Sequence, residues 1–295
     1  GIQGIPVRPL PGGIEIGSTQ AMYYFALVVV GLSVEILRRI RFLKPNSSFR
    51  SQFGYQNIMF LAAGELIPAV AGVSWDAFIK ERLFKPLGMA RSNTSAKDLQ
   101  GVADVAAPHT KRNGKVVAIP YRNIDNIAPA GSINSSVAEM AQWHRFQLGN
   151  GKYAGKQILD PAILQATHDP HIMMPVDPER KKDFPSNHFL AYGFGWVLED
   201  YRGRLIIWHN GGIDGMLSHQ GFLPEENLGV VVLTNSDRNR LDAALFYRIV
   251  DMFLGEPVKD WSQAFLAQVK EGEAKAEEAR KKAEESRVRN TKPSL

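Results

Sequence analysis

Apolar side chains at helical spacing predict the helices in the first part of the chain. Ile58 and Leu61 belong to such a pattern, which predicts a helix over residues 57–70. Ser74 has the character of an N-cap residue and predicts a further helix over residues 75–84. Other helices are expected over residues 19–42, 136–148 and 160–167. The polar, proline-containing segment 173–189 is expected to be a surface loop.

The second half of the chain changes to a pattern of short apolar runs. Four such runs occupy residues 195–198, 205–209, 218–223 and 229–233. Turn-prone pieces separate them, among them Gly211 to Gly215. Short links of this kind predict antiparallel strands that follow one another in a meander. An amphipathic pattern over residues 241–254 predicts a helix that packs on this sheet.

The two ends of the chain differ from the part between them. Residues 1–43 are expected to form an irregular N-terminus and a hydrophobic helix, and residues 44–256 the main domain. The remaining residues, 257–295, are highly charged and contain Glu and Lys four positions apart, as at Glu271 and Lys275. This pattern predicts a solvated helix or linker without a binding role.

Composition excludes several classes of function. The 295 residues are 44% hydrophobic and 22% charged, as in an ordinary soluble globular protein. The lack of cysteine excludes disulfides, thiolate metal sites and a cysteine nucleophile. The net charge of +5 is scattered along the chain, so nucleic-acid binding is not expected. The seven histidines lack the spacing of a metal site, so a metal is not expected.

One apolar stretch, from Ala21 to Val34, raises the question of a membrane. It is shorter than the roughly 20 apolar residues of a comfortable membrane span. A basic region before it and a small-residue cleavage site after it are both missing, so it does not fit a signal peptide. The pattern favours a buried core helix over a membrane anchor.

Two short motifs suggest chemistry. Tyr55-Gln56-Asn57 stands at the start of a predicted helix, and His209-Asn210-Gly211-Gly212 at the end of a predicted strand. A histidine titrates near neutral pH, and adjacent glycines let a substrate approach the backbone closely. Taken alone, the first motif could be a packing aromatic with a helix-capping asparagine. The second could be a hairpin turn with an exposed histidine.

With their surroundings, the two motifs resemble the serine beta-lactamase and penicillin-binding-protein-like hydrolases, in particular the class C-related esterase and D-peptidase branch. The surroundings that carry the resemblance are Phe49 to Gly54, Pro86-Leu87-Gly88-Met89, Tyr192 to Trp196 and Val230 to Asn235. The resemblance implies an α/β (α+β) fold, an antiparallel β-sheet flanked by helices with a reduced helical subdomain. It also implies a small-molecule acyl substrate, no cofactor, and export to the periplasm or the outside of the cell.

The resemblance also implies roles for residues. Tyr55 would be the general acid/base, and Asn57 would bind the substrate carbonyl or position the catalytic groups. His209 would present a polar or cationic group to the substrate, with Asn210 and Gly211 beside it in the substrate-binding segment. The N–H of Gly212 would line the oxyanion hole. These residues are expected to converge on one cleft.

The nucleophile does not match the family. Its members use a serine with a lysine three residues later, and no serine of this chain has a lysine at that offset. The best local match is Ser18, but the residue three positions after it is Ala21. The segment between Ser18 and Tyr55 is also shorter in sequence than in the family pattern. Two hypotheses follow. The chain is a serine hydrolase that acts through an acyl-enzyme on an ester, a β-lactam or a small amide or D-peptide, or it is an inactive or truncated homologue that binds a ligand or partner. The sequence does not indicate an oligomeric state.

Overall fold

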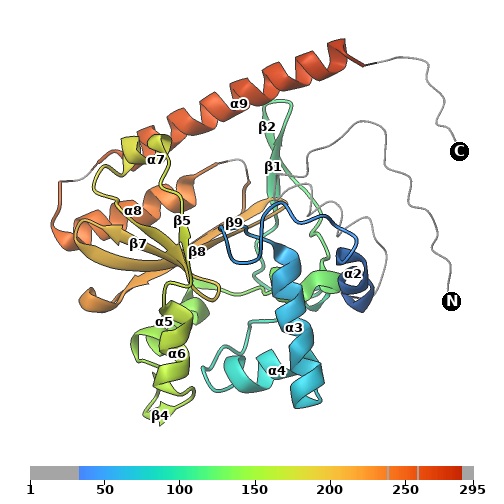
Figure 1. Cartoon of the computed structure of the whole chain (residues 1–295), viewed down its shortest axis with the longest axis vertical. Coiled ribbons are helices and arrows are strands. Elements are labelled where there is room, and N and C mark those ends of the chain that lie inside the picture. Colours follow the sequence, from blue (N-terminus) through green and yellow to red (C-terminus); the bar gives the residue numbers. More distant parts are fainter. Residues whose placement is uncertain (1–32, 238, 258, 288–295) are drawn as a thin grey trace, which may run out of the picture.

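A six-stranded antiparallel sheet lies at the centre of the structure (Figure 1). The computed structural model describes residues 33–237, 239–257 and 259–287. Each strand of the sheet pairs with the next one in sequence, so the predicted meander is confirmed. In chain order the strands are β5 (Ile172–Met174), β6 (Leu190–Tyr192), β7 (Val197–Tyr201), β8 (Arg204–Ile213), β9 (Met216–Leu223) and β10 (Leu228–Thr234).

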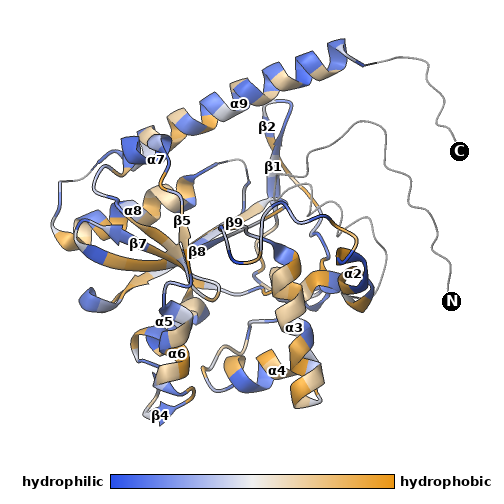
Figure 2. Ribbon diagram, in the orientation of Figure 1, coloured by the Kyte–Doolittle hydropathy of each residue, from blue (hydrophilic) through white to orange (hydrophobic). Residues whose placement is uncertain are grey.

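Helices cover both faces of this sheet. Helices α8 (Leu241–Leu254) and α9 (Trp261–Glu285) lie on one face, and α5 (Val137–Leu148) packs against the other, with α6 (Pro161–His168) beside it (Figure 1). The first two turns of α9 contain buried aromatic residues, whereas most of its remaining length is hydrophilic (Figure 2). The predicted fold, a sheet flanked by helices, is thus confirmed.

A smaller helical region lies beside the sheet. It contains α2 (Ser33–Ile40), α3 (Asn57–Ala71) and α4 (Trp75–Ile79), which continues into a π-helical turn over Lys80–Phe84. The other elements are α7 (Pro178–Asp183), the hairpins β1–β2 (His109–Arg112, Lys115–Ala118) and β3–β4 (Lys152–Tyr153, Lys156–Gln157), and the 3-10 turns Ala96–Leu99, Asp125–Ala130 and Pro224–Glu226. Of the apolar stretch 21–34, and of the predicted helix 19–42, the part before residue 33 lies outside the described residues.

Two sequence expectations about loops are wrong. The segment 173–189 contains the end of β5 and the whole of α7, and Asn187 within it is fully buried. The sequence signals were present, because Asp177 caps α7 and Pro178 occupies its first turn, where proline is well tolerated. The expected turn at Gly211 to Gly215 is also shorter, since β8 continues to Ile213 by pairing with β9.

The main core fills the space between the sheet and α8. Ile206, Leu223, Phe246 and Val250 are almost completely buried there. At Gly221 of β9, a Cβ atom would lie 2.6 Å from Trp208 Cβ and 2.8 Å from Phe246 Cζ. Only glycine lets α8 approach the sheet this closely at that point.

A buried carboxylate ties several elements together. Glu199 on β7 is completely buried, and its carboxylate lies 2.7 Å from Arg180 Nη2 of α7. It also accepts hydrogen bonds from Trp208 Nε1 on β8 at 2.8 Å and from Tyr247 Oη on α8 at 3.0 Å. A buried charge is costly unless it is paired and hydrogen-bonded. Burial raises the pKa of the Glu199 carboxyl, and all three partners oppose that rise, with both hydrogen bonds on Oε2 and the Arg180 ion pair on Oε1.

A buried histidine on the same face of the sheet has only a distant charged neighbour, Asp242, whose Oδ2 lies 3.9 Å from His219 Nδ1. His219 on β9 is 3% exposed and stacks on Trp208, with ring centroids 4.9 Å apart. Among the described residues, neither of its ring nitrogens has a hydrogen-bond partner. Burial lowers the pKa of His219 to about 3. Burial therefore favours the neutral imidazole in the folded protein at pH 7.

Among the described residues, no single helix has the length and apolar character needed to cross a membrane. Helix α3 meets that test only in combination with the helical segment Trp75–Phe84, and the two are bent by 82° at their junction.

We expect Glu199→Gln to lower the free energy of unfolding by about 3–5 kcal/mol, because it leaves the Arg180 guanidinium without its buried counter-charge. Denaturant unfolding measures the effect. Glu179→Gln is the matched control, since it removes an exposed carboxylate that pairs with Lys182 and is expected to cost at most about 1 kcal/mol. Equal losses in the two variants would contradict the role given to Glu199.

We expect His219→Phe to flatten the loss of stability in acid. Below about pH 6.5 the unfolded chain binds a proton that the buried His219 does not, so stability falls as the pH drops from about 6.5 toward about 3. At pH 4.5 this difference amounts to about 2–3 kcal/mol. Thermal unfolding from pH 7.5 to 4.5 compares the variant with wild type and with the surface variant His171→Gln. A pH dependence as steep in His219→Phe as in wild type would refute the assignment.

Candidate active site

Tyr55 lies just before the first turn of α3. Gln56, the residue between it and the helix, has an extended backbone with φ of −148° and ψ of 124°, and α3 begins at Asn57. The side chains of Tyr55 and Asn57 are both half-buried. The extended entry to the helix therefore holds the phenol of Tyr55 at the helix start, as the motif predicts.

His209 lies on β8 and faces away from α8. Side chains alternate along a strand, and Trp208 next to it packs on the α8 side. Ile207, on the same face as His209, packs instead with Trp196 and Phe222 on the α5 side. His209 is half-buried and is paired in register with Gln220 of β9.

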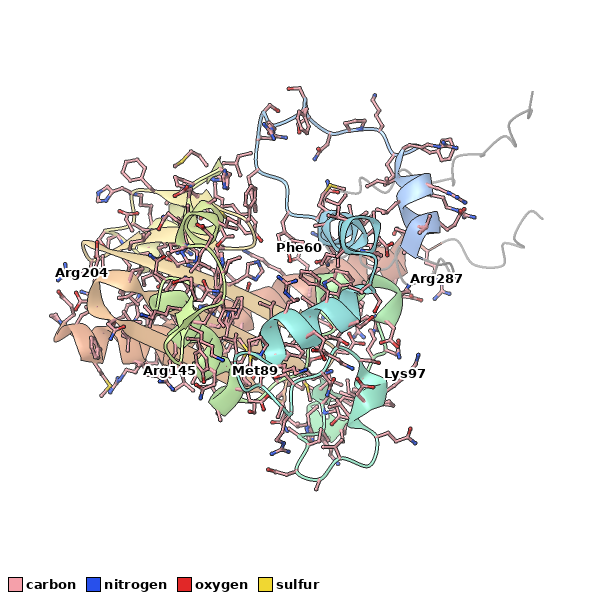
Figure 3. The ribbon with its side chains drawn as sticks, turned by 90° about the horizontal axis from the view of Figure 1, so that it is seen from below. Phe60, Met89, Lys97, Arg145, Arg204 and Arg287 are labelled. Carbon is pink, nitrogen blue, oxygen red and sulfur yellow. The ribbon has the colours of Figure 1, made fainter. Side chains whose placement is uncertain are left out.

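The structure brings Tyr55 and His209 together. Their ring centroids are 5.9 Å apart, although the two residues come from distant parts of the sequence. A third ring, that of Tyr192 at the end of β6, lies 6.2 Å from Tyr55 and 5.9 Å from His209. Phe53 packs 5.3 Å from Tyr192, and Phe60 packs 5.6 Å from Tyr55. Phe60 belongs to α3 and is labelled in Figure 3. We call these five residues the ring cluster.

Both nitrogens of His209 are hydrogen-bonded. Nδ1 lies 2.6 Å from the carbonyl oxygen of Asn210, and Nε2 lies 2.9 Å from the hydroxyl oxygen of Tyr192. A carbonyl oxygen can only accept, so Nδ1 carries a proton. In the neutral ring Nε2 must then accept the proton of Tyr192.

The environment keeps both members of this pair uncharged. Burial lowers the pKa of His209, and the bond to the Asn210 carbonyl opposes this only in part. Burial, reinforced by the nearby Tyr55, raises the pKa of the Tyr192 phenol well above its ordinary value. Of the two states that the sequence left open for His209, polar or cationic, the geometry therefore favours the neutral one at pH 7.

The other residues predicted for the site are the three that follow His209 on β8 and the candidate nucleophile Ser18. The side chain of Asn210 alternates to the other face of β8 and is exposed, so it is the carbonyl of Asn210 that touches His209. Gly211 and Gly212 lie within β8 and pair with Ser218 and Leu217 of β9. Ser18 lies outside the described residues, so its nearness to Tyr55 stays a prediction.

Sequence reasoning gave Tyr192 no role in the site. It stands directly before Gly193, where a Cβ atom would lie 2.4 Å from the carbonyl oxygen of Thr167. Only glycine fits in this crowded place, where the chain after β6 packs against the last turn of α6. The only sequence signal for Tyr192 is an aromatic residue next to an obligatory glycine at a strand end. The contact of Tyr192 with His209 depends on three-dimensional packing, which this signal does not give.

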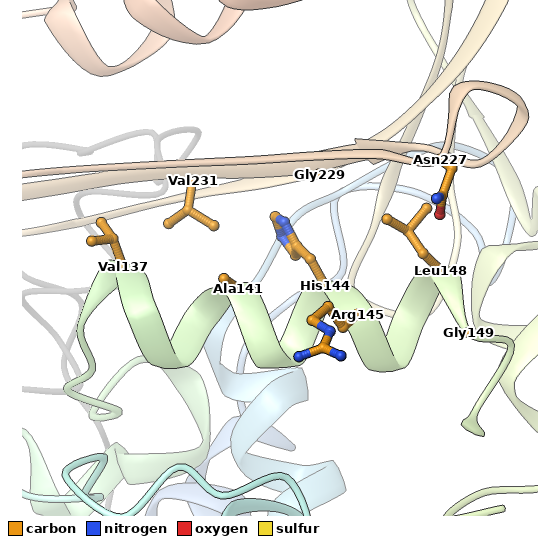
Figure 4. Close-up of a pocket in the computed structure, with 9 residues that line it drawn as sticks. All are labelled: Val137, Ala141, His144, Arg145, Leu148, Gly149, Asn227, Gly229 and Val231. Carbon is orange, nitrogen blue, oxygen red and sulfur yellow. The ribbon is translucent and has the colours of Figure 1, made fainter. Parts of the chain in front are cut away.

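A groove of about 570 Å³ lies elsewhere, between α5 and β10 (Figure 4). Its walls include Val137, Ala141 and Leu148 of α5 and Val231 of β10. None of the predicted site residues lines it. Among the described residues, no group of three or more His, Asp or Glu side chains could hold a metal ion.

Comparison with known proteins gives curated relatives that are longer than this chain. Unguisins hydrolase ungD of Aspergillus violaceofuscus is 29% identical over 248 residues, which are 78% of this chain and 43% of that protein. Protein flp of Staphylococcus aureus is 23% identical over 185 residues, which are 62% of this chain and 33% of that protein. The chain thus spans less than half the length of these relatives.

Two solved structures show the same fold. The octameric penicillin-binding protein homologue from Pyrococcus abyssi superposes with a TM-score of 0.70 at 22% identity, over 82% of this chain and 53% of that one. The D-amino acid amidase from Ochrobactrum anthropi SV3 superposes with a TM-score of 0.55 at 20% identity, over 70% of this chain and 56% of that one.

The family model described as Beta-lactamase matches residues 10–252, which include the Tyr55 motif, the His209 motif and the whole central sheet. The chain belongs to the beta-lactamase family.

Proposed function

We propose that the chain carries the acyl-transfer site of a serine hydrolase, which cleaves an ester, a β-lactam or a small amide such as a D-peptide through an acyl-enzyme. The observation that carries this proposal is the meeting of Tyr55 and His209 at a centroid distance of 5.9 Å. Two motifs far apart in sequence, each matching a motif of the family, converge on one place. Membership of the beta-lactamase family supports the same reaction class.

The proposed chemistry divides into three tasks. A serine hydroxyl attacks the substrate carbonyl, and Ser18 is the candidate. Tyr55 accepts the hydroxyl proton and returns it to the leaving group, which requires hydrogen-bond contact with the nucleophile. The N–H of Gly212 donates to the developing oxyanion, and Asn57 binds or positions the acyl group.

The ring cluster favours an apolar acyl group. Five rings, those of Phe53, Tyr55, Phe60, Tyr192 and His209, lie within 5.3 to 6.2 Å of a neighbour. Aromatic walls of this kind gain most from burying apolar or aromatic groups. The similar amidase acts, by its name, on amides of D-amino acids. We therefore place neutral amides and esters with an aromatic side chain first among the substrates to test.

A second candidate function is ligand or partner binding without turnover. The observation that favours it is the missing lysine, since no serine in the sequence has one three residues later. Without that amine, Tyr55 has to accept the proton of the serine hydroxyl unaided by the base that the family pattern places next to the nucleophile. The neutral state of His209 does not supply a replacement cation.

Labelling with a fluorophosphonate, followed by intact mass and peptide mapping, separates the two candidates. We expect one adduct, on Ser18, and a labelling rate about 10²-fold lower in Tyr55→Phe, because the general base is lost. Tyr153→Phe is the matched control. It removes a phenol hydroxyl that donates to Gln142 on α5. Tyr153 packs in an apolar cluster that contains no member of the ring cluster, so the rate is expected to stay unchanged.

The outcomes are distinct. An adduct on another serine would overturn the role of Ser18. The absence of any adduct at high probe concentration, with the protein folded, would overturn the hydrolase proposal in favour of binding alone.

A further inference from the structure

We propose that Tyr192 is the positioning residue of the site: its hydroxyl donates to Nε2 of the Nδ1–H tautomer that the Asn210 carbonyl selects, and so holds the imidazole of His209 in one orientation next to Tyr55. The catalytic consequence of this inference rests on the proposed function, whereas the tautomer itself does not. Neither the family motifs nor the sequence pattern assigns Tyr192 a task.

Both nitrogens of the His209 imidazole are engaged in hydrogen bonds. Nδ1 of His209 donates to the carbonyl of Asn210 at 2.6 Å, and Nε2 accepts from Tyr192 at 2.9 Å. Free histidine can take either tautomer, and the bond made by one nitrogen selects the state of the other. Two bonds of opposite polarity, one at each nitrogen, therefore favour a single tautomer and a single ring orientation.

Tyr192 is itself held in place by its neighbours. Its ring meets Tyr55 edge-on, with 82° between the ring planes, and meets His209 at 69°. Phe53 packs on it at 5.3 Å, and its backbone pairs with Val197 of β7. A phenol that is packed on several sides holds its hydroxyl in one direction, as a residue that positions another must.

The hydrogen-bonded pair of Tyr192 and His209 presents the Tyr192 hydroxyl oxygen to a substrate as an acceptor. A hydroxyl whose proton is given to Nε2 keeps its oxygen lone pairs free to accept, and the bond that it donates makes it a better acceptor. The imidazole has no free nitrogen left. His209 can therefore gain a proton only through Tyr192: a donor gives its proton to Tyr192 Oη, and the original phenol proton passes to Nε2. The products are a neutral Tyr192 and an imidazolium that still donates to the Asn210 carbonyl.

Nitrogen-15 NMR of the histidine side chains tests the inference without any turnover. The His209→Gln variant identifies the His209 signals among those of the seven histidines. At pH 7.5 we expect a protonated Nδ1 and an unprotonated, hydrogen-bonded Nε2. In Tyr192→Phe the Nε2 signal should move toward the position of a nitrogen without a donor, whereas Tyr153→Phe should leave it unchanged.

A wild-type His209 with its proton on Nε2 would overturn the inference, and so would an Nε2 signal that does not respond to Tyr192→Phe. The wild-type measurement decides the tautomer even if the Tyr192 variant does not fold.

Labelling kinetics test whether the pair of Tyr192 and His209 takes part in the reaction. With the fluorophosphonate probe, we expect Tyr192→Phe to slow labelling about three- to tenfold, as the loss of one hydrogen bond implies, and to change its pH profile. Unchanged labelling at every pH would overturn the catalytic part of the inference. If wild type shows the expected tautomer but no adduct forms, the proposed hydrolase function fails and the structural role of Tyr192 stands.

Discussion

The hydrogen bond from Trp208 Nε1 to the buried carboxylate of Glu199 holds Trp208 on the α8 side of β8. Because Trp208 is held on the α8 side, His209 must face the opposite side, where α5 packs. A slip of one residue in β8 would turn Trp208 toward the side of Tyr55 and His209 toward α8. The chemistry of the site thus depends on a polar contact buried on the other face of the sheet.

The same carboxylate links the sheet to its covering helices. Arg180 of α7 and Tyr247 of α8 both contact Glu199, so the outer layer and the strand register are held by one group. A second buried carboxylate, Asp251 of α8, accepts bonds from Tyr201 of β7 and Trp261 of α9. Burying two carboxylates is expensive, and their contacts connect β7 with α7, α8 and α9. The positions of the ring-cluster residues on the opposite face depend on the same strand register.

The sequence predicts the regular elements and the two motifs well, and it does so for physical reasons. Helical spacing around Ile58 and alternating short apolar runs in the second half are properties of local sequence, so α3 and the meander were predictable. The meeting of Tyr55 with His209 was predictable only through family resemblance. Tyr192 was not, because its contact with His209 spans β7 and depends on how the strand ends pack. The segment of β5 and α7 is predicted as a loop because its prolines outweigh the capping signal at Asp177.

The central claim is that the rings of Tyr55, Tyr192 and His209 share one site in solution. Nuclear Overhauser cross-peaks between ring protons, recorded on protein with labelled tyrosine and histidine, measure this most directly. Tyr55 and Tyr192 should each show cross-peaks to His209, and the peaks should disappear from the spectra of Tyr55→Leu and Tyr192→Leu respectively. A folded protein in which His209 shows no cross-peak to either tyrosine would contradict the account.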